Sequence, residues 1–391
     1  MQLKHNIVVV GSVYSRSGYG AHSRDIVSAL WKSRKFNISV LPTRWGATST
    51  TSNLPSEIMD LLNATISNKI PQNTPFTFVH VGIPPEFKKV SAVNIGITAG
   101  LETTFIPKSW VDGCNQMDGI IVPSLFERDL FQKSGVTVPI YTAGEGVDTN
   151  IFFPTNDSRS PLKFESSFNF LTGGQWIMNG DRKGIGKLIA LFCDMFQNDS
   201  NVGLVVKTFL NNLSTVDYEF AKRTINDIKG DRKYPYIYLI HGDMTDFELS
   251  QLYNHSSIKA FISVTSGEGW GRLLCEAASC DLPVMTTGWS GLTDFMDPNM
   301  STLFKYSLQD IPPSLWGNPA NGIFEKGMQW AIPDLEDVKT NIKDIIRNYD
   351  FYKGRAIEQG KVIREKWNRL ATNKQLVTAI EDIIKKVNPN L

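Results

Sequence analysis

Residues 266–278 read Ser-Gly-Glu-Gly-Trp-Gly-Arg-Leu-Leu-Cys-Glu-Ala-Ala. They follow an apolar run at 260–264 that is typical of a buried strand, and they lead into a pattern typical of a helix. A glycine-rich turn between a strand and a helix places backbone N–H groups and a helix N-terminus at the carboxyl edge of a parallel sheet. The stretch therefore predicts an α/β domain that binds an anion, and a diphosphate is the natural ligand.

Two glutamates flank this turn, and each has two interpretations. Glu276 lies about a turn and a half inside the expected helix, where it is able to reach a ribose diol. Glu268 precedes the helix, where it is able to face a sugar. Alternatively, both are solvated acids near a helix start, where the helix dipole favours negative charge. The turn by itself does not decide between these interpretations.

Alternating strand and helix patterns occupy most of the chain, which predicts parallel sheets with crossover helices. Strands of a first block are expected at 6–10, 36–41, 76–81, 93–98, 119–123 and 139–143. Strands of a second block are expected at 168–172, 202–207, 236–241, 260–264 and 282–286. Two such blocks predict two Rossmann-like, doubly wound domains, one over 1–155 and one over 156–369. The segment 148–164 has the composition of a linker, and 334–387 is expected to be helical throughout.

The composition agrees with two soluble domains. The chain has 391 residues, of which 41% are hydrophobic and 20% charged, as in globular proteins. No apolar run approaches the roughly 20 residues that span a bilayer. The four cysteines form no CxxC pair, which predicts free thiols in a reducing compartment and hence a cytoplasmic protein.

The charge is unevenly distributed. The net charge is +1, but residues 1–45 contain seven basic side chains and a single acid, Asp25. We expect Arg24, Trp31, Lys32 and Lys35 to share the solvent side of the first helix. Such a surface favours an anionic acceptor or partner, namely a charged glycan, a glycolipid at a membrane surface, or DNA. The alternative is a solvated basic face without a partner.

The glutamates around Gly-Trp-Gly resemble the donor-site motif of retaining GT-B glycosyltransferases. Seven residues separate Glu268 from Glu276, and Glu-Ala-Ala is followed four residues later by Pro-Val. The resemblance is closest to the largest family of these enzymes (group 1, or family 4-like), and it covers most of the chain. Its other elements are Asp-Gly-Ile-Ile-Val-Pro-Ser at 118–124, Gly-Val-Asp at 146–148, Phe-Pro at 153–154, Gly-Gln-Trp at 174–176 and Arg-Lys-Gly at 182–184.

The resemblance implies roles for residues of the second domain. Lys183 would neutralise the donor diphosphate, Glu268 would hydrogen-bond the sugar and Glu276 the ribose. Backbone amides around Gly269, Trp270 and Gly271 would hold the distal phosphate. Where the family has a Gly-Arg pair, this chain has Gly174-Gln175, and Arg182 or Lys207 would substitute for the missing arginine. A surface lysine at a helix start is the alternative interpretation of Lys183.

The first domain supplies further candidates. The loop that carries Gly18 and Tyr19 joins the first strand to the first helix, where the family keeps a glycine-rich loop near the donor phosphates and the acceptor. His80 and Glu102 lie at the ends of two strands and would contact the sugar or the acceptor. A packed core histidine and a structural glutamate are the alternatives. The resemblance also implies two domains that face a central cleft, with a C-terminal helix, including Trp367, that crosses back to the first domain at about 370–391.

These residues predict an enzyme that moves a sugar, with retention of configuration, from a UDP- or GDP-sugar to an acceptor hydroxyl. The acceptor is expected to be a glycan or glycoconjugate, and modified-base DNA is the alternative. No Asp-x-Asp metal motif is present in a suitable loop, so we expect no metal and no cofactor besides the donor. Two rivals of other classes are a sugar-nucleotide epimerase and a non-catalytic sugar-nucleotide-binding protein.

Overall fold

The computed structural model describes residues 5–46, 48, 50, 54–70, 73–156, 159–176, 181–209, 214–316 and 323–389. The chain forms two compact units. The first unit comprises Met1–Gly146 and Arg369–Leu391, and the second comprises Val147–Asn368. Each unit is built around one parallel sheet of six strands.

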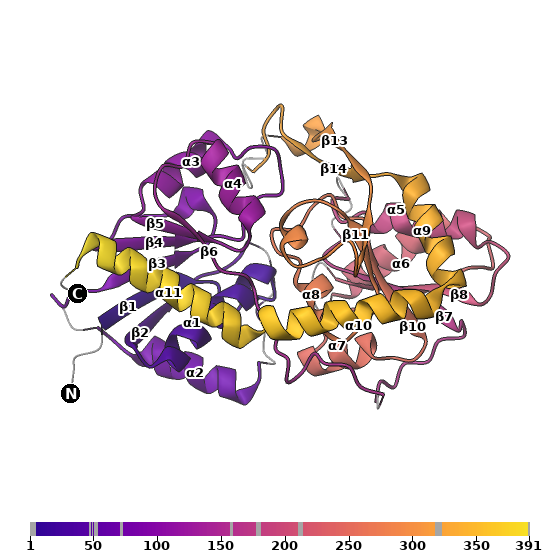
Figure 1. Ribbon diagram of the computed structural model, residues 1–391, viewed down its shortest axis with the longest axis horizontal. Coiled ribbons are helices and arrows are strands. Elements are labelled where there is room, and N and C mark those ends of the chain that lie inside the picture. The colour runs from indigo at the N-terminus through magenta and orange to yellow at the C-terminus, as the bar shows by residue number, and fades with distance from the viewer. Residues whose placement is uncertain are drawn as a thin grey trace. The chain divides into compact units, whose positions relative to one another are not determined.

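The sheet of the first unit has the strand order β2-β1-β3-β4-β5-β6, and all neighbours are parallel (Figure 1). Its strands are β1 (His5–Gly11), β2 (Phe36–Pro42), β3 (Thr77–Val81), β4 (Val93–Ile97), β5 (Gly119–Val122) and β6 (Ile140–Thr142). Its helices are α1 (Gly18–Ser33), α2 (Ser56–Ser67), the short η1 (Pro84–Glu86), α3 (Lys108–Asn115), α4 (Leu125–Lys133) and α11 (Arg369–Val387).

Helices α1 and α11 cover the core of the first unit. Their buried side chains, among them Ile26, Leu30, Ile380 and Ile383, pack with the apolar residues of β1, β3 and β4. The last helix of the chain thus completes the core of the first unit, as expected. Trp367 does not belong to this helix: it follows the end of α10 (Tyr349–Lys366) in the second unit, where its ring lies 4.9 Å from that of Trp270.

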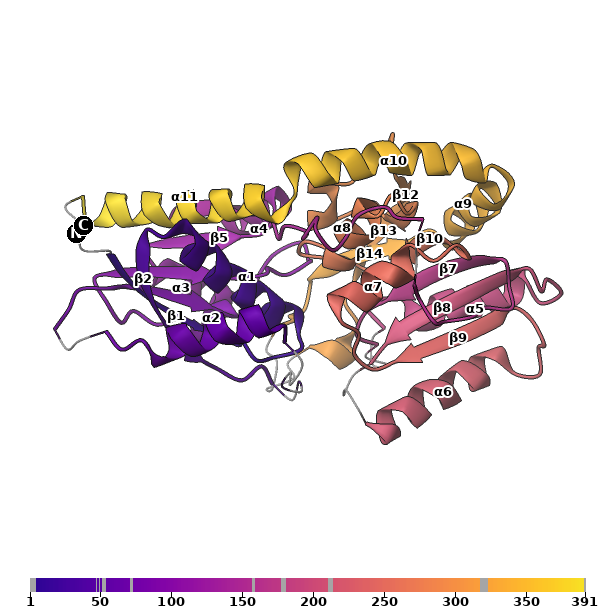
Figure 2. The same ribbon diagram turned by 90° about the horizontal axis from the view of Figure 1, so that it is seen from below.

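The sheet of the second unit has the order β12-β11-β10-β7-β8-β9, and its neighbours are parallel. Its strands are β7 (Phe168–Gly173), β8 (Val202–Thr208), β9 (Tyr236–His241), β10 (Ile258–Ser263), β11 (Val284–Thr287) and β12 (Thr302–Phe304). Its helices are α5 (Ile185–Met195), α6 (Thr215–Lys229), α7 (Asp246–Tyr253), α8 (Arg272–Ser279), α9 (Leu335–Arg347), α10 and the short η2 (Gly291–Asp294) and η3 (Pro313–Leu315). Figure 2 shows α6 along β9, the edge strand.

Three features of the second unit differ from the sequence-based expectations. The segment after Gly146 is part of this unit rather than a linker, because Phe152 is buried in its core and its carbonyl accepts a hydrogen bond from Ser279 at 2.6 Å. The C-terminal helical stretch is three helices, which break at Asn348 and at Trp367. A hairpin of β13 (Tyr306–Asp310) and β14 (Gln329–Pro333) follows β12 and was not expected.

Each sheet has one point at which the strand order reverses. In the second unit this point lies between β7 and β10, because β8 and β9 extend to one side of β7 while β10, β11 and β12 extend to the other. In the first unit it lies between β1 and β3. Open α/β sheets bind ligands outside the carboxyl ends of the two strands at such a point.

Candidate functional site

The loops that follow β7 and β10 meet at the reversal point of the second sheet. The backbone of Ser266 donates to the carbonyl of Arg182 at 2.8 Å, and the Arg182 guanidinium donates to the carbonyl of Gly267 at 2.8 Å. Gly184 has a φ of 68°, and a Cβ at this residue would lie 2.6 Å from the Val264 carbonyl oxygen. Glycine therefore allows the two loops to approach each other closely.

Lys183 and Glu268 form an ion pair across these loops. The Lys183 ammonium donates a hydrogen bond to Oε1 of Glu268, and each side chain is 19% exposed. Burial opposes ionisation of Glu268, but the charges of Lys183 and Arg182 outweigh it, so the pKa of Glu268 lies below its usual value. The predicted phosphate-binding and sugar-binding side chains are therefore together, and both are charged at neutral pH.

Glu268 is also held through its backbone. Its N–H donates to Oγ of Ser290 at 2.8 Å, and its carbonyl accepts from Gly291 at 2.9 Å. Ser290 has a φ of 75°, a conformation that costs a residue with a side chain of the order of 1–3 kcal/mol. The loop after β11 thus stores backbone strain at the contact with the Glu268 loop. No sequence pattern marks the strained serine.

Asp181 caps α5 and was missed by the sequence analysis. Its carboxylate accepts hydrogen bonds from the backbone N–H groups of Ile185, Gly186 and Lys187 at 3.1, 3.0 and 3.3 Å. The usual capping signal is a polar residue directly before the helix, whereas Gly184 holds that position here and Asp181 lies three residues earlier, so no local pattern marks it. Helix α8 is different, because Gly271 precedes it with a φ of 98° and no side chain caps it.

Glu276 and Trp270 differ in burial. Glu276 is half-buried on α8, and after burial itself its charge is the largest contribution that raises the pKa of Tyr253. Trp270 is 2% exposed, and its ring packs against Phe295. The Trp270 side chain is therefore part of the core.

The two candidates for the missing arginine differ in their surroundings. Arg182 lies at Gly267, and its charge acts on Glu268. Lys207, on β8, donates to the carbonyl of Gly242 at 2.7 Å and lies over the ring of Phe209. Arg182 therefore supplies the second positive charge beside Lys183 and Glu268, whereas Lys207 is bonded on the β9 side.

The candidates of the first unit gather at the carboxyl edge of its sheet. Gly18 is the exposed first residue of α1, and the Tyr19 hydroxyl is 2.9 Å from Oγ1 of Thr98. Glu102 is half-buried after β4. His80 is half-buried between aromatic rings, 5.3 Å from the Phe87 centroid, and burial lowers its pKa. The surroundings of His80 are those of a packed, neutral histidine.

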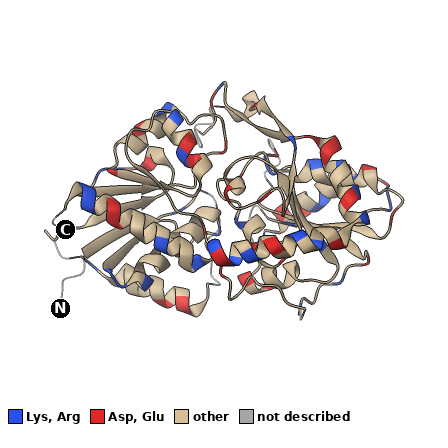
Figure 3. Cartoon of the chain, in the orientation of Figure 1, with Lys and Arg blue, Asp and Glu red and all other residues tan. Residues whose placement is uncertain are grey.

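The basic N-terminal segment forms the expected solvent face only in part. Trp31, Lys32 and Lys35 are exposed, although Lys35 follows the helix and pairs with Glu381 of α11 at 2.7 Å. Figure 3 shows acidic residues interspersed with basic ones along α11.

Arg24 departs from the expectation. It donates to the carbonyls of Val13 and Ser15 at 2.9 and 3.0 Å, so it fixes the loop before α1. The expectation was wrong for Arg24, because sequence spacing does not show which carbonyls lie within reach.

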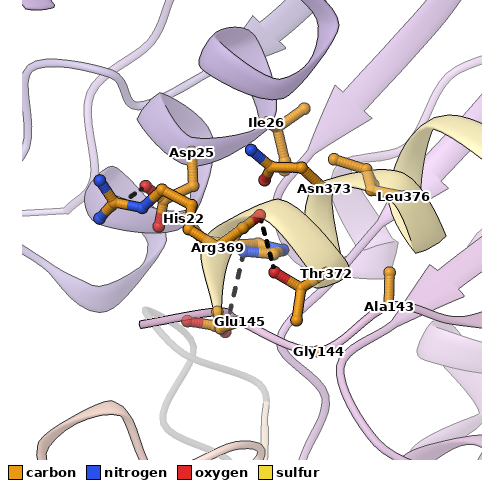
Figure 4. Close-up of a pocket in the computed structure, with 11 residues that line it drawn as sticks. His22, Asp25, Ile26, Ala143, Gly144, Glu145, Arg369, Thr372, Asn373 and Leu376 are labelled. Carbon is orange, nitrogen blue, oxygen red and sulfur yellow. Dashed lines mark hydrogen bonds and ion pairs between the residues drawn. The ribbon is translucent and has the colours of Figure 1, made fainter. Parts of the chain in front are cut away.

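A small pocket of the first unit lies where α1, the segment after β6 and α11 meet (Figure 4). Asp25 pairs with Arg369 at 3.4 Å, and Nδ1 of His22 lies 3.9 Å from Oε1 of Glu145. These contacts connect α1 to the two points at which the chain leaves the first unit, after Gly146, and returns to it, at Arg369. The pocket is a structural junction that the sequence did not predict.

The described residues contain neither a metal-binding cluster nor a membrane-spanning helix. In those ranges no three His, Cys, Asp or Glu side chains are grouped so that they could hold a metal ion. No helix there has the length and apolar character needed to cross a bilayer. The four cysteines are buried and free.

Sequence comparisons find one similar curated protein and no matching family. No family model matches the chain. A curated relative, the uncharacterized protein 356 of Sulfolobus islandicus rod-shaped virus 1, is 22% identical over 306 residues, which are 75% of this chain and 77% of the relative.

Solved structures are similar over almost the whole chain. A sucrose-phosphate synthase from Thermosynechococcus elongatus has a TM-score of 0.68 at 14% identity, and covers 98% of this chain and 100% of its own. Anabaena HepE in complex with UDP and glucose has a TM-score of 0.65 at 11% identity, with 97% and 100% covered. A glycosyltransferase from Rickettsia africae has a TM-score of 0.62 at 13% identity, with 99% and 100% covered. The chain has the α/β fold of these proteins, the GT-B fold, with two Rossmann-like parallel sheets.

Proposed function

We propose that this protein is a retaining glycosyltransferase that transfers a sugar from a nucleoside diphosphate sugar to an acceptor hydroxyl. The observation that carries the proposal is the ion pair of Lys183 and Glu268 at the reversal point of the second sheet. A cation, a carboxylate and an uncapped helix N-terminus meet there, and each matches one part of a sugar diphosphate.

The ion pair suits an anion-binding site in its unliganded state. Without a donor, Glu268 neutralises Lys183, and Arg182 adds a second positive charge. In the proposed complex the diphosphate takes the place of Glu268 at Lys183, and the carboxylate accepts a hydrogen bond from a sugar hydroxyl. Glu276 binds the ribose, and the backbone around residues 269–271 binds the distal phosphate.

The proposed reaction forms two bonds and breaks two. The acceptor oxygen bonds to the anomeric carbon while the bond from that carbon to the phosphate oxygen breaks, and the acceptor proton passes to the departing phosphate. Lys183 and the N-terminus of α8 stabilise the negative charge that develops on the leaving group. Attack from the face that the phosphate leaves gives retention of configuration. The resemblance to retaining enzymes supports this stereochemistry.

UDP-sugars are the first donors to test, because one of the similar structures contains UDP and glucose. The acceptor is proposed to be a glycan or glycoconjugate. The free, buried cysteines fit a reducing compartment such as the cytoplasm.

The first test measures release of the nucleoside diphosphate from UDP-, GDP- and ADP-sugars, with NMR of the sugar product. Lys183→Ala should cost about 2–4 kcal/mol of transition-state stabilisation, which is roughly a 30- to 900-fold loss of turnover. Lys187→Ala is the matched control, because Lys187 is an exposed lysine on α5, four residues after Lys183. The proposal fails if Lys183→Ala turns over like the control. An epimerised sugar nucleotide as the product would identify an epimerase, and binding without turnover a non-catalytic protein.

A further inference from the structure

A stacked aromatic pair lies beside the reversal point of the first sheet. The indole of Trp45 and the phenol of Tyr19 have centroids 3.9 Å apart and planes inclined by 24°. Tyr19 lies in the first turn of α1, after β1, and Trp45 lies in the loop after β2. The pair is therefore at the carboxyl ends of neighbouring strands, where this class of sheet binds ligands.

Hydrogen bonds hold both members of the pair. The Tyr19 hydroxyl is bonded to Oγ1 of Thr98 at 2.9 Å and accepts from the N–H of Ala99 at 3.1 Å, so the end of β4 fixes the ring. The carbonyl of Trp45 accepts from the N–H of Thr48 at 3.0 Å. A bridge between Ser15 and Thr50 then ties this loop to the loop before α1. Trp45 is nevertheless only half-buried.

We infer that the Trp45 ring, backed by Tyr19, is a platform on which the first unit binds a sugar ring of the acceptor. An indole that is fixed on one face and partly open presents a flat apolar surface at little entropic cost, and the C–H face of a pyranose matches such a surface. This inference rests on the proposed function, since it assigns the acceptor.

The polar groups beside the stack favour a carbohydrate. Glu102 is half-buried and lies close enough to act electrostatically on Tyr19, whereas Thr98 and Glu127 beside it are fully buried. A carboxylate such as that of Glu102 accepts hydrogen bonds from sugar hydroxyls, whereas it repels a phosphodiester. Arg44, exposed next to Trp45, suits a phosphate, so single-stranded DNA is the rival occupant.

The test is binding of defined probes to the full-length protein. Saturation-transfer NMR with methyl glucopyranoside, maltose and cellobiose should show binding to the wild type, with the strongest transfer to the C–H protons of one sugar face. Trp45→Ala should weaken that binding roughly tenfold, and Trp45→Phe should restore part of it. Trp31→Ala is the control, since Trp31 is an exposed tryptophan (48%) on the far part of α1.

The outcomes are separable. The inference is overturned if no sugar probe binds in a Trp45-dependent way, or if a (dT)10 oligonucleotide binds through Trp45 and the sugars do not. Circular dichroism of each variant distinguishes a lost contact from a lost fold. Release of UDP from a UDP-sugar by the wild type tests the proposed function independently, because the residues proposed for the donor belong to the second unit.

Discussion

Glu127 illustrates how a single buried residue can make stability depend on pH. The side chain is fully buried on α4, and Oε2 accepts from the N–H of Leu101 at 3.0 Å. Oε1 has no hydrogen-bond partner among the described residues. Burial, and then the charge of Glu102, raises the pKa of Glu127 well above its usual value. The folded protein therefore keeps this carboxyl protonated at pH values where the unfolded chain ionises it.

The sign of the effect follows from proton binding. Above the pKa of the unfolded chain the folded state binds one more proton, so stability falls as the pH rises, by up to about 1.4 kcal/mol per pH unit. Glu127→Gln replaces the protonated acid by a neutral group of the same shape. We expect its melting temperature to exceed that of the wild type at pH 8 and to match it at pH 5. Glu57→Gln, at an exposed site on α2, is the control. Parallel pH profiles for Glu127→Gln and the wild type would contradict this assignment.

At the scale of elements, the close approach of two loops at Gly184 leads to a second prediction. An alanine there would have a left-handed backbone and a Cβ 2.6 Å from Cγ2 and the carbonyl oxygen of Val264. Strain and overpacking together should cost about 2–4 kcal/mol of stability and displace Lys183. Gly354→Ala is the matched control, because this glycine lies inside α10 with no atom within 4 Å of a new Cβ. The control should be stabilised by roughly 0.5–1 kcal/mol. Urea denaturation measures the free energy of unfolding of each variant. Equal changes of this free energy in Gly184→Ala and Gly354→Ala would contradict the argument.

The sequence predicts most of the strands. Each strand expected in the two blocks is present within a few residues, because most of them are continuous apolar runs. The three-residue strand β12 was missed. The hairpin β13–β14 was missed because all five residues of β13 are exposed, so no apolar pattern marks it. Helices α9 and α10 were merged because the break at Asn348 carries neither glycine nor proline.

The candidate site was predictable in part for a similar reason. The glycine turn, Glu268 and Lys183 belong to local motifs, and the resemblance joins them although 85 positions separate the two charges. The bonds of Arg24 to Val13 and Ser15, the strain at Ser290 and the stack of Trp45 on Tyr19 depend on how loops fold back. No local pattern encodes these contacts.

At the scale of the whole molecule, the charges proposed to stabilise the leaving group are all supplied by the protein. Lys183, Arg182 and the N-terminus of α8 lie in the second unit. We therefore expect sugar transfer to continue in EDTA at a rate within about twofold of the untreated enzyme, since no step of the proposed reaction uses a divalent ion. Activity assays with EDTA, and with Mg²⁺ or Mn²⁺ added back, provide the measurement. Loss of activity in EDTA with recovery on adding the metal would refute this expectation.

The route of the chain between the units also has a consequence for synthesis on the ribosome. The first unit begins with β1 but closes with α11, whose side chains fill the core between residues far upstream. A nascent chain that has emerged only as far as Asn368 holds every residue of the second unit, yet it lacks the helix that packs against α1, β4, β5 and β6 of the first unit. The second unit can therefore fold first. The apolar surface of the first unit stays exposed to chaperones until the last helix has been synthesised.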